Sequence, residues 1–229
     1  MQKIVEFLKS NGLSVFSLLA IIGLAAWAAT KPGLPLIPAV SPDVSPITQI
    51  TPLAFQSLND QLAGVAKDLG LNTEVFSECL SSRKYQALVN ASTQEGKTLG
   101  INGTPSSIVN GTLVVGAVPL SDLERPLDAQ GGLLKPKTEG FAFLGKENAP
   151  STIVEFGDYL CGYCQRYHDD ILPQLRDKYI NTGKVKFVFK DMVIFGENSQ
   201  LIAEAARCAG DQGKFWEFHA KGFTLKSAD

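Results

Sequence analysis

Apolar residues recur at helical spacing in the segment that begins at residue 53. Between residues 53 and 69 they fall three or four positions apart, and Gly70 suits the end of a helix. A second helix is expected to begin at Asn72 or Thr73, and a third helical stretch reaches Leu99. The pattern therefore predicts a helical region over residues 53–99.

Shorter apolar runs with β-branched side chains follow. Residues 106–109 and 112–115 have strand character, and Asn110-Gly111 between them is a pair that favours a two-residue hairpin turn. Residues 119–128 predict a short amphipathic helix. Residues 129–140 contain two adjacent glycines and little periodicity, which indicates a flexible connection.

Strands and helices alternate in the rest of the chain. Residues 141–144 predict a short strand, residues 152–156 a buried apolar strand, and residues 184–190 a third strand in which Val185, Phe187 and Phe189 alternate with lysines and Val188. Helical spacing returns over residues 161–179, 199–209 and 214–223. The mixture is typical of an α/β domain.

The first thirty residues carry a targeting pattern. Lys3 and Lys9 precede an uncharged stretch from Asn11 to Thr30 whose centre is apolar. Its length lies between that of a signal peptide and the roughly 20 residues of a transmembrane helix. We expect residues 1–31 to be a membrane anchor or a signal segment, with the uncleaved anchor favoured. Residues 32–52 are rich in proline and predict a semi-rigid tether. Lysines before the span place the following chain outside the cytoplasm.

Composition narrows the range of partners. The chain has 229 residues, of which 45% are hydrophobic, and a formal net charge of -2 with acidic and basic residues interleaved. Its length allows one full domain with an export segment, or two small domains. Nothing in this charge pattern favours nucleic acid or an anionic membrane surface.

Four cysteines, Cys79, Cys161, Cys164 and Cys208, carry the candidate chemistry. An even number in an exported chain can be fully paired. Structural zinc sites generally use two close pairs, whereas this chain has a single CxxC, so we expect no metal.

The sequence Cys161-Gly162-Tyr163-Cys164 stands where a predicted strand gives way to a helix. A cysteine at a helix N-terminus has its thiolate favoured by the helix dipole and by unpaired backbone N–H groups. We therefore expect Cys161 to be the nucleophile and Cys164 the resolving thiol of a redox-active pair. A purely structural disulfide is the alternative. No dissociable cofactor is implied.

These residues carry a family resemblance. The stretch from Val154 to Cys164 and the stretch from Ala205 to His219 closely resemble the first half of DsbA-like thiol-disulfide oxidoreductases. Residues 70–80 and 100–105, with the Asn-Gly hairpin, resemble the second half of the same family. Here the second half comes first in the sequence.

Three arrangements explain the reversed order: a circular permutation, remnants of two tandem domains, or a truncated or misassembled piece of a longer sequence. We favour permutation, in which residues 53–128 and 141–229, joined by the linker 129–140, form one thioredoxin-like domain with an inserted helical region.

The resemblance implies roles for further residues. Thr104-Pro105 matches the loop that holds a cis-proline against the CxxC and pairs with substrate, and Glu155 matches a buried acid that relays the proton of Cys164. Gly162-Tyr163 resembles the pair of disulfide isomerases, so we expect a potential less oxidising than roughly -120 mV. Cys79 and Cys208 occupy positions that form a structural disulfide in many relatives. An ordinary turn proline, a solvated glutamate and free core cysteines are the alternatives.

The expected protein is a membrane-tethered, extracytoplasmic thiol-disulfide oxidoreductase. Its partners would be substrate proteins with thiols or disulfides and a membrane redox protein, either quinone-linked or reducing. Isomerase or reductase activity is an alternative direction of the same chemistry. A non-catalytic peptide-binding or assembly protein is the alternative from another class.

Overall fold

The computed structural model describes residues 57–129 and 131–225. The predicted anchor over residues 1–31 and tether over residues 32–52 lie outside these ranges. Within them, no helix combines the length and the apolar character needed to cross a bilayer.

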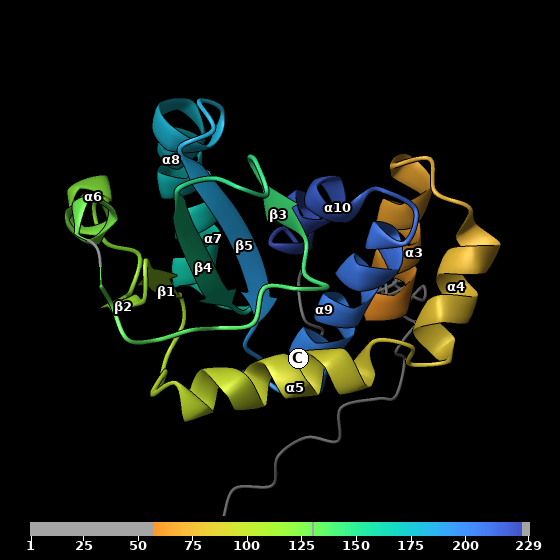
Figure 1. Cartoon of the computed structure of the whole chain (residues 1–229). Helices are drawn as coiled ribbons and strands as arrows, with labels where there is room; N and C mark the ends of the chain where they lie inside the picture. Colours follow the sequence, from red (N-terminus) through yellow and green to blue (C-terminus); the bar gives the residue numbers. More distant parts are fainter. Residues whose placement is uncertain (1–56, 130, 226–229) are drawn as a thin grey trace, which may run out of the picture. The chain divides into compact units, whose positions relative to one another are not determined.

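The described residues form a five-stranded sheet with helices around it (Figure 1). The order along the sheet is β2-β1-β4-β5-β3. Only β4 and β5 run parallel; the other neighbours are antiparallel. The elements are α3 (Leu58–Asp68), α4 (Thr73–Ser81), α5 (Gln86–Thr98), β1 (Ser106–Val109), β2 (Thr112–Val115), α6 (Leu120–Asp128), β3 (Phe143–Leu144), β4 (Ser151–Gly157), α7 (Gly162–Arg166), η1 (Tyr167–Ile171), α8 (Leu172–Leu175), η2 (Arg176–Ile180), β5 (Val185–Asp191), α9 (Glu197–Gly210) and α10 (Phe215–Gly222).

The hairpin between β1 and β2 has the predicted two-residue turn. Asn110 and Gly111 have φ angles of 45° and 86°, the left-handed conformations that a tight turn between twisted strands requires. Val109 then faces Thr112 across the pair. On its other side β1 pairs with β4. β1 precedes the predicted connection over residues 129–140 and β4 follows it, so strands from both sides of this connection join in one sheet.

The helix that follows the CxxC is continuous but not uniformly α-helical. It runs through α7, η1, α8 and η2, and η1 and η2 are π-helical turns. Pro173 lies in its middle. Since proline has no N–H, it removes one i to i−4 hydrogen bond, and the wider turn before it accommodates the ring. The helix predicted over residues 161–179 is therefore confirmed, with a local change of pitch.

Each face of the sheet has its own apolar layer. Alternation along β4 sends Ile153 to one face, where the CxxC helix and α6 cover it, and Val154 to the other, beneath Ile101 and Met192. Helices α3, α4, α9 and α10 form a separate helical region beside the sheet (Figure 1). The site described below lies where this region meets the end of β4.

The connection predicted over residues 129–140 makes hydrogen bonds at Leu134 and Lys137. Leu134 N–H donates to the Gly111 carbonyl at 3.0 Å, and Lys137 N–H donates to the Glu95 carboxylate at 2.6 Å. Lys190 bonds both the Glu95 carboxylate at 2.6 Å and the Lys137 carbonyl at 3.0 Å. Residues 131–138 have no regular secondary structure, as expected for a connection, and polar side chains of α5 and β5 bond their backbone.

The alternation predicted for β5 is only partly right. Lys190 is one of the lysines that alternate with the apolar residues, yet its side chain is fully buried. The strand lies between β4 and β3, and neighbouring segments cover both of its faces. A buried ammonium is tolerated here because Glu95 pairs with it and the Phe141 ring lies 4.1 Å away.

Candidate active site

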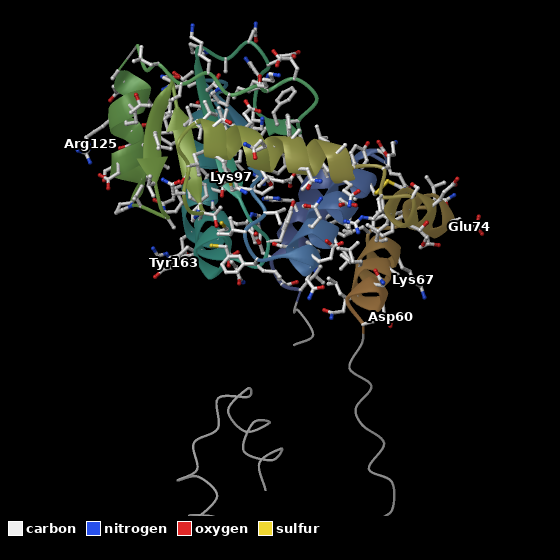
Figure 2. All side chains as sticks on the ribbon, turned by 90° about the horizontal axis from the view of Figure 1, so that it is seen from below. Asp60, Lys67, Glu74, Lys97, Arg125 and Tyr163 are labelled. Carbon is white, nitrogen blue, oxygen red and sulfur yellow. A yellow bond between two sulfur atoms is a disulfide. The ribbon has the colours of Figure 1, made fainter. Side chains whose placement is uncertain are left out.

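The two cysteines of the CxxC lie at the start of α7. Cys161 is the N-cap residue, and Cys164 lies in the first turn. Cys161 is 5% exposed and Cys164 is fully buried, whereas Tyr163 between them is 63% exposed. Figure 2 shows the Tyr163 side chain at the outer edge of the molecule. The turn therefore presents Cys161 towards the surface and buries Cys164 behind it.

The thiol of Cys161 is acidic. Its pKa is lowered to about 5, first by the Cys164 thiol as a hydrogen-bond donor and also by the backbone N–H groups of Tyr163 and Cys164 at the helix N-terminus. Both cysteines are in the free, reduced state. Cys161 is therefore largely a thiolate at neutral pH.

The thiol of Cys164 has the opposite character. Burial raises its pKa, and the hydrogen bond to Cys161 and the nearby Glu155 carboxyl raise it further. The Asp158 N–H lies 3.4 Å from its sulfur. The proton of the pair thus remains on Cys164 while the charge remains on Cys161.

The Thr104-Pro105 loop lies directly against the dithiol. Its peptide bond is cis. The Cys161 sulfur is 3.3 Å from the Thr104 carbonyl oxygen. The loop leads into β1, and the pairing of Ser106 with Phe156 of β4 fixes its position. Residues separated by more than fifty positions therefore meet because β1 and β4 are neighbours in the sheet.

Glu155 is buried beneath the CxxC helix. It shares a face of β4 with Ile153, the face that this helix covers, and it is 2% exposed. Burial raises its pKa to about 8, with a further contribution from the charge of Cys161. Ser107 lies opposite it on β1, and the Ser107 hydroxyl donates to the Tyr167 hydroxyl at 3.2 Å. A carboxyl with this pKa can donate or accept a proton near neutral pH.

Asp158 is a site residue that the sequence reading did not single out. Its buried carboxylate accepts hydrogen bonds from the N–H groups of Leu160 at 2.8 Å and Ile194 at 2.8 Å, and from the Ser199 hydroxyl. It therefore ties the CxxC turn to the segment between β5 and α9. The signal in the sequence was an acid directly after a buried strand and three residues before Cys161.

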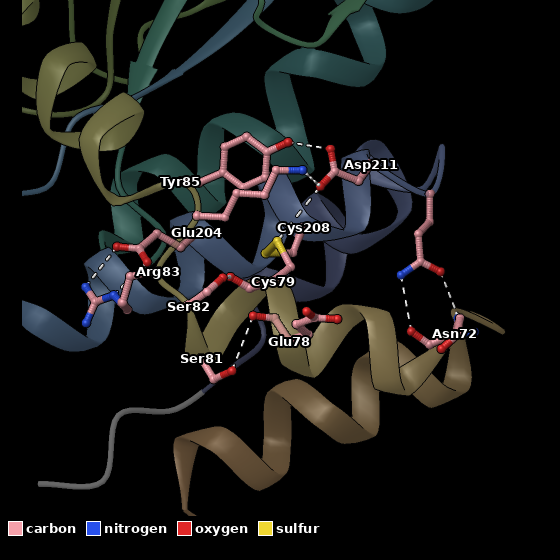
Figure 3. The surroundings of a disulfide bond; sticks show 12 residues. Asn72, Glu78, Cys79, Ser81, Ser82, Arg83, Tyr85, Glu204, Cys208 and Asp211 are labelled. Carbon is pink, nitrogen blue, oxygen red and sulfur yellow. Dashed lines mark hydrogen bonds and ion pairs between the residues drawn. A yellow bond between two sulfur atoms is a disulfide. The ribbon is translucent and has the colours of Figure 1, made fainter.

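Cys79 and Cys208 form a disulfide between α4 and α9, with their Cα atoms 5.9 Å apart (Figure 3). Around it, Arg83 bonds Glu204 at 2.7 Å, and Lys84 and Tyr85 both bond Asp211. These contacts and the disulfide join the helices before the hairpin to α9.

A small pocket of about 240 Å³ opens beside the nucleophile. Its lining residues are Tyr159, Leu160, Cys161, Gly162, Gln165, Phe223 and Leu225. No group of three or more metal-ligating side chains occurs in residues 57–129 and 131–225. The reaction that this site can carry out is thiol-disulfide exchange at Cys161.

Two family models match the chain, one on each side of the connection. Residues 54–128 match the DSBA-like thioredoxin domain, and residues 137–228 match the thioredoxin family model.

Individual relatives match mainly over part of the chain. The chain is 40% identical over 102 residues to disulfide bond formation protein D of Bacillus subtilis, covering 44% of this chain and 45% of that protein. It is 34% identical over 76 residues to a putative protein-disulfide oxidoreductase of Rickettsia prowazekii, covering 33% and 28%. The crystal structure of oxidised BdbD from Bacillus subtilis matches with 38% identity and a TM-score of 0.36, covering 41% of this chain and 51% of that one.

The chain thus spans less than half the length of these two curated relatives. The family models nevertheless match both sides of the connection, and strands from both sides build one mixed sheet, with the CxxC just after its central strand β4. Both sides of the connection therefore match thioredoxin-type family models, the DSBA-like thioredoxin domain before it and the thioredoxin family after it.

Proposed function

We propose that this protein is a thiol-disulfide oxidoreductase that exchanges disulfides with substrate proteins through Cys161 and Cys164. The opposite acidity of the two thiols carries the proposal: Cys161 has a pKa of about 5, and Cys164 has a raised pKa. An ordinary structural pair needs no such asymmetry, whereas a nucleophile and its resolving thiol do.

The exchange takes two steps. A substrate thiolate attacks the Cys161 sulfur of the oxidised protein, which forms a mixed disulfide and breaks the Cys161–Cys164 bond. Cys164 leaves as a thiolate and takes a proton, for which the Glu155 carboxyl is the proposed donor. A second substrate thiolate then attacks the substrate sulfur of the mixed disulfide and expels Cys161 as a thiolate. The substrate gains a disulfide, and the protein gains two electrons and becomes the dithiol.

Thr104 is the proposed backbone contact for the substrate. Its carbonyl oxygen lies 3.3 Å from the Cys161 sulfur, so an extended peptide that reacts at Cys161 passes within reach of the Thr104 backbone. Gly162 leaves the approach open, since an added Cβ at this position would meet no atom within 4 Å. The exposed Tyr163 ring forms the outer side of the same approach.

We further propose that residues 53–128 and 141–229 form one circularly permuted domain, located outside the cytoplasm and anchored by the N-terminal segment. The antiparallel pairing of β1 with β4 supports the single domain. The charge pattern of the N-terminus supports the location. The redox partner in the membrane is the protein that reoxidises the dithiol or, in the opposite direction, reduces the disulfide.

The alternative of a non-catalytic peptide-binding protein required the Thr104-Pro105 loop to lie away from the dithiol. The 3.3 Å distance argues against it. Isomerase and reductase activities use the same residues as net oxidation. The reduction potential of the Cys161–Cys164 pair decides which of the three activities the protein has.

Reduction of insulin and refolding of a scrambled, disulfide-containing substrate test the proposal. The full chain should catalyse both, and Cys161→Ala should abolish both while it leaves the thermal melting curve cooperative. Activity that persists in Cys161→Ala, or an inactive wild type with a folded dithiol, would overturn the assignment.

The reduction potential of the pair provides a second test. A Cys161 pKa of about 5 lies between roughly 7 for thioredoxin and roughly 3.5 for the most oxidising members of this family. We therefore expect a potential between about -120 and -270 mV. Equilibration with glutathione measures it, and a value at either limit would contradict the inferred thiolate stability.

A further inference from the structure

The small pocket beside Cys161 and the Thr104-Pro105 loop lie on opposite sides of the nucleophile. β4, which leads to the CxxC turn, runs between β1 and β5 in the sheet. The loop leads into β1, and neither of its residues lines the pocket. Tyr159 does line it, and its ring packs towards β5, 5.6 Å from the ring of Phe189. Cys161 is itself a lining residue, so the pocket opens at the residue that reacts.

The far wall of the pocket comes from the segment at the end of α10. Its two lining residues, Phe223 and Leu225, are both buried. The Tyr159 ring lies 5.0 Å from the Phe223 ring, and the Tyr159 hydroxyl makes a buried 2.9 Å hydrogen bond with His219 Nδ1. Gly222 leaves room for this ring, because a Cβ there would lie within 2.8 Å of it. The walls are therefore fixed in advance, and an occupant pays little for ordering them.

The pocket has the size and the chemistry for one uncharged side chain. Its volume is about 240 Å³, and a cavity of roughly 150 Å³ already holds a benzene ring. Four of the seven lining residues are large and apolar, and no lysine, arginine, aspartate or glutamate lines the pocket. A charged side chain would find no partner there, whereas an aromatic or aliphatic side chain gains free energy from its burial.

The covalent chemistry of exchange decides what reaches this pocket. In a mixed disulfide the Cα atoms of the two cysteines lie about 5.5–6 Å apart, and each neighbouring residue of the substrate is about 3.8 Å further along the chain. The residues that flank the substrate cysteine are therefore within reach of both sides of Cys161. On one side, the Thr104 carbonyl can bond the substrate backbone, which carries no side-chain preference. On the other side, the pocket can receive a side chain.

We infer that the pocket between Tyr159, Gln165 and Phe223 is a specificity subsite, which binds an aromatic or large aliphatic side chain next to the reacting cysteine of the substrate protein. The inference rests on the proposed function, because exchange at Cys161 is what brings that residue to the pocket. It adds a sequence preference to a reaction whose backbone contact at Thr104 is indifferent to sequence. Substrate cysteines beside phenylalanine or leucine react in preference to those flanked by small or charged residues.

Mixed disulfides with short peptides measure this preference. In the full chain with Cys164→Ala, a mixed disulfide at Cys161 has no resolving thiol and accumulates. Oxidised glutathione first forms a mixed disulfide with Cys161 and releases one glutathione thiolate. A peptide thiolate then attacks the Cys161 sulfur and expels the second glutathione thiolate.

Two pairs of acetylated, amidated peptides are the probes, since the side chain can stand before or after the cysteine. They are Ser-Phe-Cys-Ser-Ser and Ser-Ser-Cys-Phe-Ser, each compared with its counterpart that has alanine in place of phenylalanine. In at least one pair, the equilibrium constant for displacing glutathione from Cys161 should be at least about ten-fold larger for the phenylalanine peptide, as burial of the ring allows.

Substitutions on the CxxC helix locate the preference. Gln165→Trp should fill the pocket and reduce the ratio between the phenylalanine and alanine peptides to about one. Gln174→Trp is the matched control, because it makes the same change at an exposed position about 14 Å further along this helix, and it should retain the ratio. A ratio near one in both pairs before these substitutions, or a ratio that survives Gln165→Trp, would overturn the inference.

A contact measurement keeps the test decisive if Gln165→Trp alters the fold. In the mixed disulfide of the Cys164→Ala chain, nuclear Overhauser effects should link the ring protons of the peptide phenylalanine to the Leu225 methyl groups. Val118 reports on the other side of Cys161, because it follows Gly116, whose N–H donates to the Pro105 carbonyl at 2.8 Å. Effects to the Val118 methyl groups in place of Leu225, or none to Leu225, would overturn the inference.

The proposed exchange and the subsite fail in different ways. If Cys161 forms no mixed disulfide with glutathione or with any peptide, the proposed function is wrong, and the subsite with it. If mixed disulfides form equally well with the phenylalanine and alanine peptides, exchange at Cys161 stands and the subsite alone is refuted.

Discussion

Cys161 and Cys164 stand three residues apart, and their surroundings move their pKa values in opposite directions. The N-terminus of α7 and the Cys164 thiol favour the charge on Cys161, while burial keeps Cys164 neutral. Because folding lowers the pKa of Cys161, the thiolate stabilises the reduced fold at high pH, and this contribution is lost as the pH falls through about 5.

Glu155→Gln should change both stability and exchange. The folded pKa of Glu155 is about 8, above the ordinary value of 4.5, so the folded protein holds a proton that the unfolded chain releases as the pH rises between these values. That difference costs the wild type stability, on the order of 3 kcal/mol at pH 7. The glutamine variant should therefore be more stable than the wild type at pH 7 and equal to it near pH 4.

Urea unfolding at the two pH values measures this difference. In exchange assays, Glu155→Gln should slow the step at Cys164 by roughly ten-fold or more, because the proton donor is gone. If the unfolding free energies of the two proteins differ by the same amount at both pH values, or if the exchange rate is unchanged, Glu155 is a solvated carboxyl without a role in exchange.

At the scale of elements, Asp158 connects the CxxC turn with the start of α9. Asp158→Ala leaves the N–H groups of Leu160 and Ile194 without their acceptor. We expect a loss of about 1–3 kcal/mol in stability, since each group is buried or half-buried. Amide hydrogen exchange should quicken at both of these positions. Ser57→Ala, which removes the N-cap of α3, is the matched control and should leave exchange at the CxxC turn unchanged. Protection at Leu160 that survives Asp158→Ala would contradict the connecting role.

The disulfide between α4 and α9 joins positions 129 residues apart in sequence. Replacing both Cys79 and Cys208 by alanine should cost about 2–4 kcal/mol of unfolding free energy, because the unfolded chain gains freedom. Denaturant unfolding measures it, and insulin reduction below the melting temperature should persist. A cost under about 1 kcal/mol would show that helix packing alone holds this region together.

At the scale of the whole molecule, the reversed order of the two halves has a direct consequence. If both halves fold within one chain, a soluble fragment from Ile50 to Asp229 should be monomeric and should melt in one cooperative transition. Analytical ultracentrifugation and differential scanning calorimetry measure both properties. A stable dimer would mean instead that β1 of one chain pairs with β4 of another, as in domain swapping.

The prediction of a monomer depends on the connection over residues 129–140, which has to join the two halves within one chain. Lys190 and Glu95 hold the backbone at Lys137, and Phe141 lies against the buried Lys190 and Arg207 side chains. These contacts fix the passage between the halves on the sheet surface. A segment without regular secondary structure can thus be held in place by side chains of other elements.

The sequence by itself determined the local elements and the reactive pair. Helix spacing, the Asn110-Gly111 turn and the strand before Cys161 depend on residues close together in the chain, where backbone preference and periodicity act directly. The family resemblance of the sequence led us to expect Thr104 at Cys161 and a buried Glu155, whereas the tertiary structure alone decided that Asp158 meets Ile194 and that Lys190 meets Glu95. These contacts follow from strand order and burial, because the neighbour of β4 in the sheet is β1, and no local pattern specifies that pairing.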